Sequence, residues 1–212
     1  MKDDGSHSIQ LADEQLLLLP ERALWWPQQK ALGLSDVHFG KSATFRANGI
    51  PVPEGESQED LDRINRLLGR YPAQRLVIAG DFFHSPVPLI SSLDALLREW
   101  LAGLTVEVIL VRGNHDPACF QLIRSAESLA MGDLLFIHDP VAAPPDQACI
   151  TGHVHPLCRI GKAGPRSRVP CFVQSGVCLT LPAFGTFTSG SIMQRDEKTL
   201  LFPVVAGKVH AF

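Results

Sequence analysis

Residues 107–117 read EVILVRGNHDP, and this stretch decides the fold that we predict for the chain. The apolar residues 108–111 favour β structure and are typical of a buried strand. Within three residues the strand gives way to an amide, an imidazole and a carboxylate, those of Asn114, His115 and Asp116. In open α/β sheets ligands bind at the carboxyl ends of the strands, so this stretch indicates a functional site at a sheet edge.

The composition predicts one globular domain spanning residues 1–212. That length is enough for one sizeable core and short for two domains. A hydrophobic content of 45% and a charged content of 19% exclude a disordered or fibrous chain. The net charge of -3 provides no general attraction for nucleic acid or for an anionic membrane, so a bound polyanion must be held by a local feature.

Cysteine usage and the N-terminal sequence predict a cytoplasmic protein with no membrane association. The five cysteines form an odd set without a CxxC pair, which argues against a disulfide framework and against a thiolate zinc site. The N-terminus, MKDDGSHSIQ, lacks the basic-then-apolar order of a signal peptide. The apolar run at 16–19 is far shorter than the ~18 residues that a membrane span needs.

Strands and helices alternate along the first two thirds of the chain, and the last third is rich in strands. We predict a helix at 57–71, a strand at 75–81, a helix at 89–102, a strand at 106–111, a further helix beyond Leu122, a strand at 134–138 and a final hairpin at 200–212. Ser57 and Asp60 have the spacing of a capping box at the start of the first helix. This order predicts an α/β fold in which two sheets pack face to face and are flanked by helices.

Residues of metal-ligand type follow five of the apolar runs. They are Asp36 and His38, Asp81 with His84, the Asn114 group, His138, and His153 with His155. One histidine at a strand end would be read as a hydrogen-bonded structural residue. Five coincident groups are different, because burying so many imidazoles and carboxylates is costly unless they pair or coordinate a cation. The pattern therefore predicts a metal centre.

In chain order, the motifs DVH, GDFFH, GNHD, a single histidine at 138 and GHVH resemble the five motifs of the calcineurin-like metallophosphoesterases. The resemblance implies the two-sheet αββα sandwich of that family. GDFFH and GNHD are more similar to the Mre11-like nucleases than to the protein phosphatases. The phrases LSDVHFGKSATFRANGIPVP, TGHVHP and LPAFGTFTSG, together with HDP after LLFI, resemble the bacterial ligase-associated DNA damage response endonuclease family called PdeM.

The resemblance implies seven ligands for two divalent cations. Asp36, His38, Asp81 and His155 would bind one cation, and Asp81, Asn114, His138 and His153 would bind the other. The two oxygens of the shared carboxylate can span cations about 3.5–4 Å apart. Oxygen and imidazole ligands without thiolate suit manganese, iron or zinc. We favour manganese, because the resemblance to these nucleases implies it.

His115 and Asp116 are the predicted catalytic residues. By resemblance, His115 would stabilise the transition state or protonate the leaving oxygen during in-line attack of water on phosphorus. Asp116 would orient His115 and favour its charged form. Alternatively, Asp116 is a helix N-cap followed by Pro117 at the first helical position, and both roles can hold together.

The predicted substrate contacts are a histidine and four basic residues. They are His84, Lys41 and Arg46 in the loop after DVHFG, and Arg159 and Arg166 in the segment after GHVHP. His84 would face the substrate, or would pack beside Phe82 and Phe83. No acidic residue lies between Asp146 and Asp196, so the basic segment could contact a phosphate backbone; its charges could equally be solvated.

Three functions compete for these motifs. The first is a phosphodiesterase or endonuclease acting on DNA, in DNA repair, and the resemblance suggests work alongside an ATP-dependent DNA ligase, a helicase and an exonuclease. The second is a phosphatase or phosphodiesterase for a nucleotide or another small phosphoester. The third is a non-catalytic scaffold, which is disfavoured because the chain retains every ligand and the histidine of GNHD.

Overall fold

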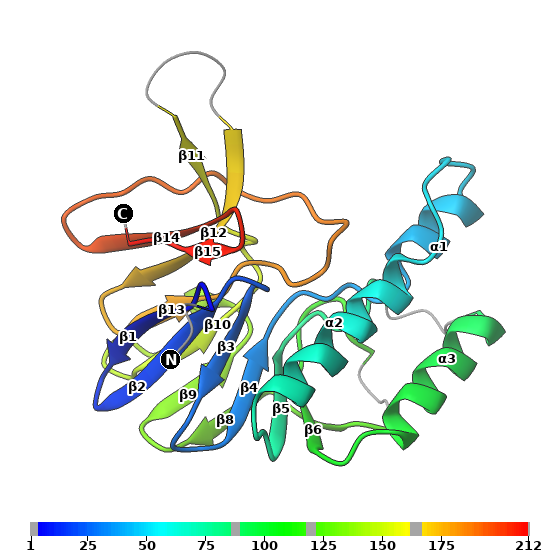
Figure 1. Ribbon diagram of the computed structural model, residues 1–212, viewed down its shortest axis with the longest axis horizontal. Coiled ribbons are helices and arrows are strands. Elements are labelled where there is room, and N and C mark those ends of the chain that lie inside the picture. Colours follow the sequence, from blue (N-terminus) through cyan, green and yellow to red (C-terminus); the bar gives the residue numbers. More distant parts are fainter. Residues whose placement is uncertain (1–3, 86–89, 118–121, 162–166, 212) are drawn as a thin grey trace.

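Two β-sheets pack face to face in the computed structural model, which describes residues 4–85, 90–117, 122–161 and 167–211 (Figure 1). The first sheet contains, in spatial order, β1 (His7–Leu11), β2 (Glu14–Leu19), β3 (Ala23–Trp26), β4 (Ala31–Leu34), β5 (Arg75–Ala79), β6 (Glu107–Val111) and β7 (Arg124–Ala126). Strands β1 to β4 form an antiparallel meander, and β4 to β7 are parallel. The carboxyl ends of four strands therefore meet at one edge.

The second sheet is mixed in the same way. Its spatial order is β15 (Lys208–Val209), β14 (Thr199–Val205), β12 (Ser167–Ser175), β13 (Cys178–Thr180), β10 (Cys149–Thr151), β9 (Leu134–Ile137) and β8 (Ser128–Met131), and β11 (Leu157–Ile160) pairs with β12 beside this path. Strands β9, β10 and β13 are parallel to one another. Beyond the sandwich, β11 and β12 form a projecting hairpin (Figure 1).

The apolar run at 16–19 shows how the strands divide their side chains between two cores. Successive side chains of a strand point to opposite faces. Leu16 and Leu18 enter the core between the sheets, where they lie with Trp26 and Phe136. Leu19 lies in the core on the other face of the first sheet. A continuous apolar run is thus explained by burial on both faces.

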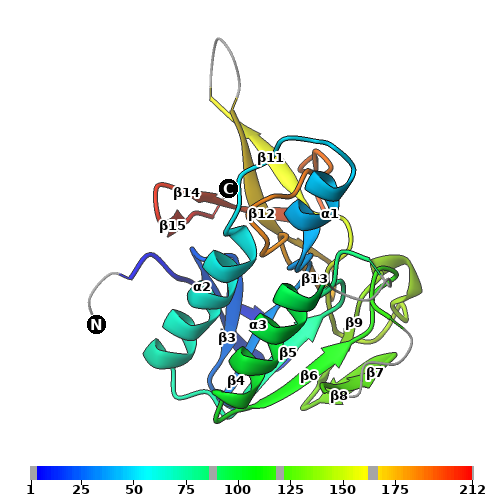
Figure 2. The ribbon, with the colours of Figure 1, turned by 90° about the vertical axis from the view of Figure 1, so that its right-hand side faces the viewer.

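Helices cover the outer face of the first sheet (Figure 2). These are α2 (Glu56–Arg70) and α3 (Ser91–Ala102). The other helical elements of the described residues are a shorter helix, α1 (Lys41–Ala47), and a 3-10 turn, η1 (Pro140–Ala142). Leu61, Ile64 and Leu67 of α2 are fully buried, as their helical spacing predicts. The two-sheet sandwich is confirmed. None of the described helices is long and apolar enough to cross a membrane.

The predicted capping box is wrong. Helix α2 begins after Gly55, and no side chain caps its first turn. The hydroxyl of Ser57 instead accepts the Gly40 N–H at 3.1 Å, and the buried carboxylate of Asp60 accepts from Arg63 and from the Thr186 N–H. Both side chains tie α2 to distant loops, which the local spacing could not reveal.

Two further predictions of local structure are also wrong. The residues after Leu122 form the strands β7 and β8 and not a helix. The reason is that β6 has an open edge, and β7 pairs there in parallel with residues Ile109–Val111 of β6. The loop predicted after DVHFG contains α1. Helix α1 starts after Gly40, whose left-handed φ of 86° reverses the chain as it leaves the sheet.

Candidate metal centre

The loops that follow β4 and β5 bring the first ligands together. Parallel pairing continues beyond both strands: the Asp36 N–H donates to Gly80 O at 2.9 Å and the His38 N–H donates to Asp81 O at 3.0 Å. A parallel bridge between Phe39 and Phe83 extends this pairing further. The backbone therefore fixes Asp36 and His38 beside Asp81 before any side-chain contact is considered.

Left-handed backbone is concentrated at the predicted ligands. Among the described residues other than glycine, nine have positive φ, and five of them are Asp36 (53°), His38 (53°), Asp81 (50°), His153 (70°) and His155 (47°). The remaining four lie in the turns between antiparallel strands. Such a conformation costs an L-residue roughly 1–3 kcal/mol and persists only where the surroundings impose it, which is typical of functional sites.

The first group of side chains consists of Asp36, His38 and His155, whose ligand atoms all lie within 4.8 Å of one another. The Nε2 atoms of His38 and His155 are 3.1 Å apart, and His155 Nε2 is 3.2 Å from Asp36 Oδ1. Asp36 is fully buried and also accepts the His153 N–H. Two imidazole nitrogens that face each other beside a buried carboxylate fit a shared cation.

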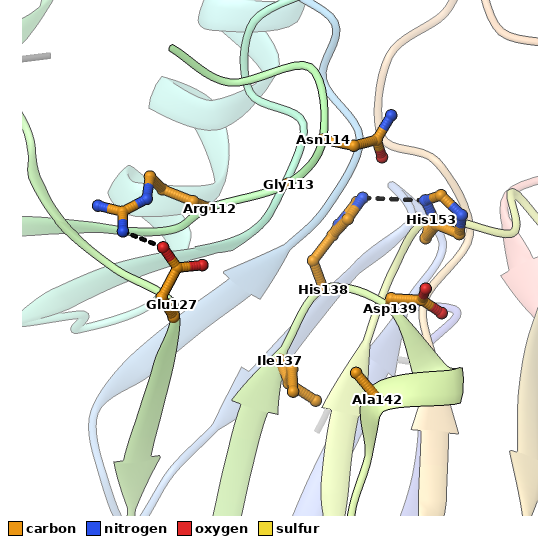
Figure 3. Close-up of a pocket in the computed structure, with 9 residues that line it drawn as sticks. All are labelled: Arg112, Gly113, Asn114, Glu127, Ile137, His138, Asp139, Ala142 and His153. Atoms are coloured by element: carbon orange, nitrogen blue, oxygen red, sulfur yellow. Dashed lines mark hydrogen bonds and ion pairs between the residues drawn. The ribbon is translucent and has the colours of Figure 1, made fainter. Parts of the chain in front are cut away.

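The second group consists of Asp81, His138 and His153, with the same spacing limit of 4.8 Å. Nε2 of His138 is 3.2 Å from His153 Nδ1 and 3.3 Å from Asp81 Oδ2. Asn114 lines the same cavity as His138 and His153, and Figure 3 shows its amide beside them. The structure thus brings all seven predicted ligands to one edge, with Asp81 in the second group only and not in both as predicted.

Backbone carbonyls fix the orientation of two ligand imidazoles. Nδ1 of His138 lies 2.9 Å from Ala79 O, and Nδ1 of His155 lies 2.8 Å from Ser189 O. A carbonyl oxygen only accepts, so Nδ1 must carry the proton in both rings. Nε2 is then the nitrogen of each ring that could bind a cation once it has lost its own proton, an arrangement common among metal-bound histidines.

Buried carboxylates draw positive charge into both groups. Burial by itself lowers the pKa of a histidine, but for His138 the hydrogen bond and charge of Asp81 outweigh it and raise the pKa to about 9. Asp36 raises the pKa of His155 in the same way against burial. Burial lowers the pKa of His38 to about 4, so this ring is a neutral donor. A divalent cation would replace the protons on His138 and His155, and oxygen and imidazole donors suit such a cation.

His115 is anchored by a neighbour other than the one predicted. Its Nδ1 lies 2.9 Å from His84 O, so the ring donates Nδ1–H to that carbonyl, and Nε2 lies 4.0 Å from Asp81 Oδ2. Its backbone N–H donates to Asp81 Oδ1. His115 therefore leaves Nε2 open toward the second ligand group while its side chain stays 40% exposed.

The prediction that Asp116 orients the His115 ring is wrong. The Asp116 carboxylate accepts three backbone N–H groups, those of Asp81, Phe83 and Gly113, at 2.8–3.0 Å. It is buried, and burial raises its pKa to about 6 against these hydrogen bonds. Asp116 thus clamps the GDFFH loop to the GNHD loop. The alternative of a helix N-cap concerns residues 118–121, which lie outside the described residues.

The predicted substrate contacts separate into residues near the metal groups and residues away from them. The ring of His84 lies 5.8 Å from those of His38 and His115, on the side of the ligands. Lys41 lies on α1, and its positive charge acts to lower the pKa of both His38 and His155. Arg46 instead binds Pro53 O and pairs with Glu54, and no described contact joins it to the ligands.

The basic segment forms part of the projecting hairpin. Arg159 is exposed on β11, the strand that begins at Leu157, two residues after His155. Its cross-strand partner on β12 is Arg168, which is also exposed. Lys162 and Arg166 lie outside the described residues.

A cavity of about 380 Å³ opens beside the second ligand group (Figure 3). Asn114, His138 and His153 line one side, and an ion pair between Arg112 and Glu127 lines the other. The sequence analysis did not single out these last two residues, since an ordinary arginine and glutamate carry no motif signal. The cavity gives the second group access to solvent.

The loop at 181–190, LPAFGTFTSG, carried part of the family resemblance but was given no role at the site, although its glycines were a usable signal. Gly190 is in such close contact with His155 that a Cβ at this position would overlap the His155 carbonyl. The next residue back, Ser189, supplies the oxygen that fixes the His155 ring. The loop therefore supports the first ligand group from outside the five motifs.

Comparison with known proteins places these features in context. The family model described as calcineurin-like phosphoesterase matches residues 30–163, which include all seven ligands. The crystal structure of Pseudomonas putida nuclease MPE is similar at a TM-score of 0.81 and 29% identity, over 98% of this chain and 100% of that one. No curated protein matches.

Two other solved structures show weaker similarity. The phosphoesterase Yfce from E. coli has a TM-score of 0.43 and 15% identity, over 84% of this chain and 95% of that one. A double mutant of Vps29 from Entamoeba histolytica has a TM-score of 0.35 and 18% identity, over 76% and 88%. At these scores neither structure contributes to the argument.

Proposed function

The chain belongs to the calcineurin-like phosphoesterase family and is a metal-dependent phosphoester hydrolase, and from that premise we propose that it is a manganese-dependent endonuclease acting on DNA. One observation carries the proposal. The similarity to a nuclease extends over 98% of this chain, so it includes the loops and the hairpin around the metal centre as well as the common sandwich. These surrounding elements are the ones that would contact a polymeric substrate.

The seven predicted ligands would hold two cations, and Asp81 is the carboxylate that we propose the two cations share. When bound, two divalent cations lower the pKa of water and neutralise the phosphate oxygens. The chain itself supplies orientation: Ala79 O and Ser189 O hold His138 and His155 with Nε2 toward the centre. Manganese suits the oxygen and imidazole donors, and it is the metal that the resemblance to the nucleases implies.

His115 would transfer the proton to the leaving oxygen. Because Nδ1–H is held by His84 O, Nε2 is the atom that gains and loses a proton. This atom lies 4.0 Å from Asp81 Oδ2, beside the second ligand group, and the side chain of His115 is 40% exposed. Asp116 acts indirectly in this account, by clamping the two loops that carry Asp81 and His115.

The projecting hairpin would bind the phosphate backbone. Like charges directly opposite on neighbouring strands destabilise a hairpin, so the pairing of Arg159 with Arg168 is unfavourable for folding alone. A polyanion lying across β11 and β12 would remove that repulsion. Lys41, on the other side of the first ligand group, would contact the same backbone.

A role in DNA repair is part of the same proposal. The similarity of the loop phrases to the ligase-associated endonucleases suggests that the protein works in the cytoplasm alongside an ATP-dependent DNA ligase, a helicase and an exonuclease. The alternative substrate is a nucleotide or another small phosphoester, which would need the metal centre and His115 but not the hairpin.

The test compares a circular single-stranded DNA with a mononucleotide, using metal-depleted protein to which manganese is added. An endonuclease opens the circle, because it needs no chain end. Replacing Arg159 and Arg168 together with alanine should weaken cleavage and reduce its salt slope by about 0.7 per lost phosphate contact. The control replaces Arg66 and Arg98, two arginines on the helical face. Turnover of the nucleotide without cleavage of DNA would contradict the proposal.

A further inference from the structure

Beside the first ligand group is a small hollow that the metal chemistry does not use. Its volume is about 320 Å³, and it is lined by Lys41, Phe45 and residues 186–189. Pockets that hold small molecules begin at about this size. One wall belongs to α1 and the other to the loop after β13, so the fold joins two distant parts of the chain to form it.

An exposed aromatic ring lies in this hollow. The side chain of Phe187 is 37% exposed, and it is the one aromatic among the large apolar residues that the described chain leaves exposed. Phe45 holds it in an edge-to-face contact, with ring centroids 5.6 Å apart and planes at 77°. A ring fixed at the surface by contact with another ring offers a flat apolar face on which a ligand ring can stack.

A cation lies beside the two rings. Nζ of Lys41 is 5.9 Å from the centroid of Phe45 and 6.0 Å from that of Phe187. The salt bridges of the described residues do not include Lys41, and burial lowers its pKa. The charge of Glu56 raises that pKa against burial, but no salt bridge of the described residues joins Glu56 to Lys41. The hollow therefore combines a π surface with an ammonium group, which suits a flat ring attached to an anion.

Both walls of the hollow touch the metal centre. Ser189, in the same loop as Phe187, holds His155 through its carbonyl at 2.8 Å. Phe45 meets the ring of His84 edge to face at 5.8 Å, and His84 in turn holds His115 through its own carbonyl. A group in the hollow is thus linked to His115 through Phe45 and His84.

We propose that this hollow is a nucleobase subsite, in which a base next to the cleaved phosphodiester stacks on Phe187 while Lys41 binds a neighbouring phosphate. The inference rests on the proposed function, because it requires a DNA substrate. Every base has a π face, so stacking on an aromatic side chain binds single strands without regard to sequence. Bases in a duplex are already stacked on one another, so the subsite makes the enzyme favour unpaired DNA.

An abasic scan tests the proposal. Single-stranded oligonucleotides carry one abasic residue at successive positions around the cleavage point, and each is cleaved by wild type, Phe187→Ala and Phe187→Trp with manganese. At one position the wild type should lose roughly tenfold in rate when the base is missing, the scale of one stacking contact. Phe187→Ala should cut the intact strand at that lower rate and lose the sensitivity to the abasic residue, whereas Phe187→Trp should retain it.

Two further measurements separate the outcomes. Leu200→Ala removes another exposed apolar side chain, on β14, and should behave as wild type. A 2-aminopurine placed at the sensitive position should change its fluorescence on binding to wild type and not to Phe187→Ala. If the wild type cleaves DNA and Phe187→Ala keeps the full abasic sensitivity, the subsite is refuted and the nuclease function stands. If the wild type hydrolyses methyl 4-nitrophenyl phosphate but no DNA, the proposed function fails and the subsite fails with it.

Discussion

The core between the sheets and the metal centre are consecutive parts of the same strands, yet they obey opposite rules. In β5, Val77 and Ala79 face the inter-sheet core, and the next residue in the alternation is Asp81. In β9, Phe136 is followed in the same way by His138. The core buries apolar groups on regular backbone. The site buries charges, and Asp81 has a φ of 50°.

The difference shows which part of the chain stabilises the fold. Burying apolar side chains favours folding, whereas an unpaired buried carboxylate and a left-handed backbone both oppose it. The metal centre therefore costs stability that the core supplies, and bound cations would return part of it. Substitutions in the two regions should then affect stability and activity in opposite ways.

The largest effect is expected from Asp81→Asn. The amide keeps an oxygen for the His115 N–H but loses the charge that would bridge two cations. Cleavage should fall to background, and metal analysis should show lower occupancy at both positions. The matched control is Asp60→Asn, which alters another buried aspartate outside the ligand groups and should keep its metals. Full occupancy and full rate in Asp81→Asn would refute the bridging role.

His115→Ala should reduce the rate by roughly 10²–10⁴ while the metals and the fold are retained. His115 is absent from both ligand groups, although it contacts Asp81 and lies edge to face with the ring of His38 at 5.2 Å. His138→Ala provides the contrast, because it removes a ligand and should release metal. Loss of metal from His115→Ala to the same extent would show that the assignment of roles is wrong.

Phe172→Ala tests the core side of the comparison. Phe172 is fully buried between the sheets on β12, so the cavity left by its ring should cost about 3–5 kcal/mol in the free energy of unfolding. Chemical denaturation measures this loss. The rate per folded molecule should stay within about twofold of wild type, since no ligand changes. A collapse of activity at full folding would mean that core and site are not separable.

The smallest effect is expected from two substitutions at His153, where φ is 70°. Glycine adopts this conformation without strain, so metal-free His153→Gly should be more stable than His153→Ala by about 1 kcal/mol. At Ser128, an exposed position on β8, the order should reverse, because glycine weakens a strand. Equal stabilities of the two His153 variants would remove backbone strain from the account.

Most features that depend on the spacing of residues along the chain could be predicted from the sequence. Alternating and helical spacing located β5, β6, β9, α2 and α3, because burial of one face imposes those periods. The motifs predicted seven ligands, six of which the structure gathers in two groups that could hold a metal, because each follows a strand whose end lies at the same edge.

Other features depend on partners that are distant in the sequence. Ser57 and Asp60 have capping spacing but bind Gly40 and Thr186, and Asp116 binds three backbone groups in place of the ring next to it. The strand β7 exists because β6 offers it an edge. Likewise, the contact of Phe45 with Phe187 follows from the meeting of α1 and a late loop, and no spacing records it.

Calorimetric titration of the metal-free protein with manganese tests the central claim most directly, namely that the strained strand ends exist to hold two cations. The account predicts two ions per chain, a rise in the unfolding temperature on binding, and loss of both sites in Asp81→Asn. A wild-type protein that binds no manganese, or only one ion, with unchanged unfolding temperature would contradict it.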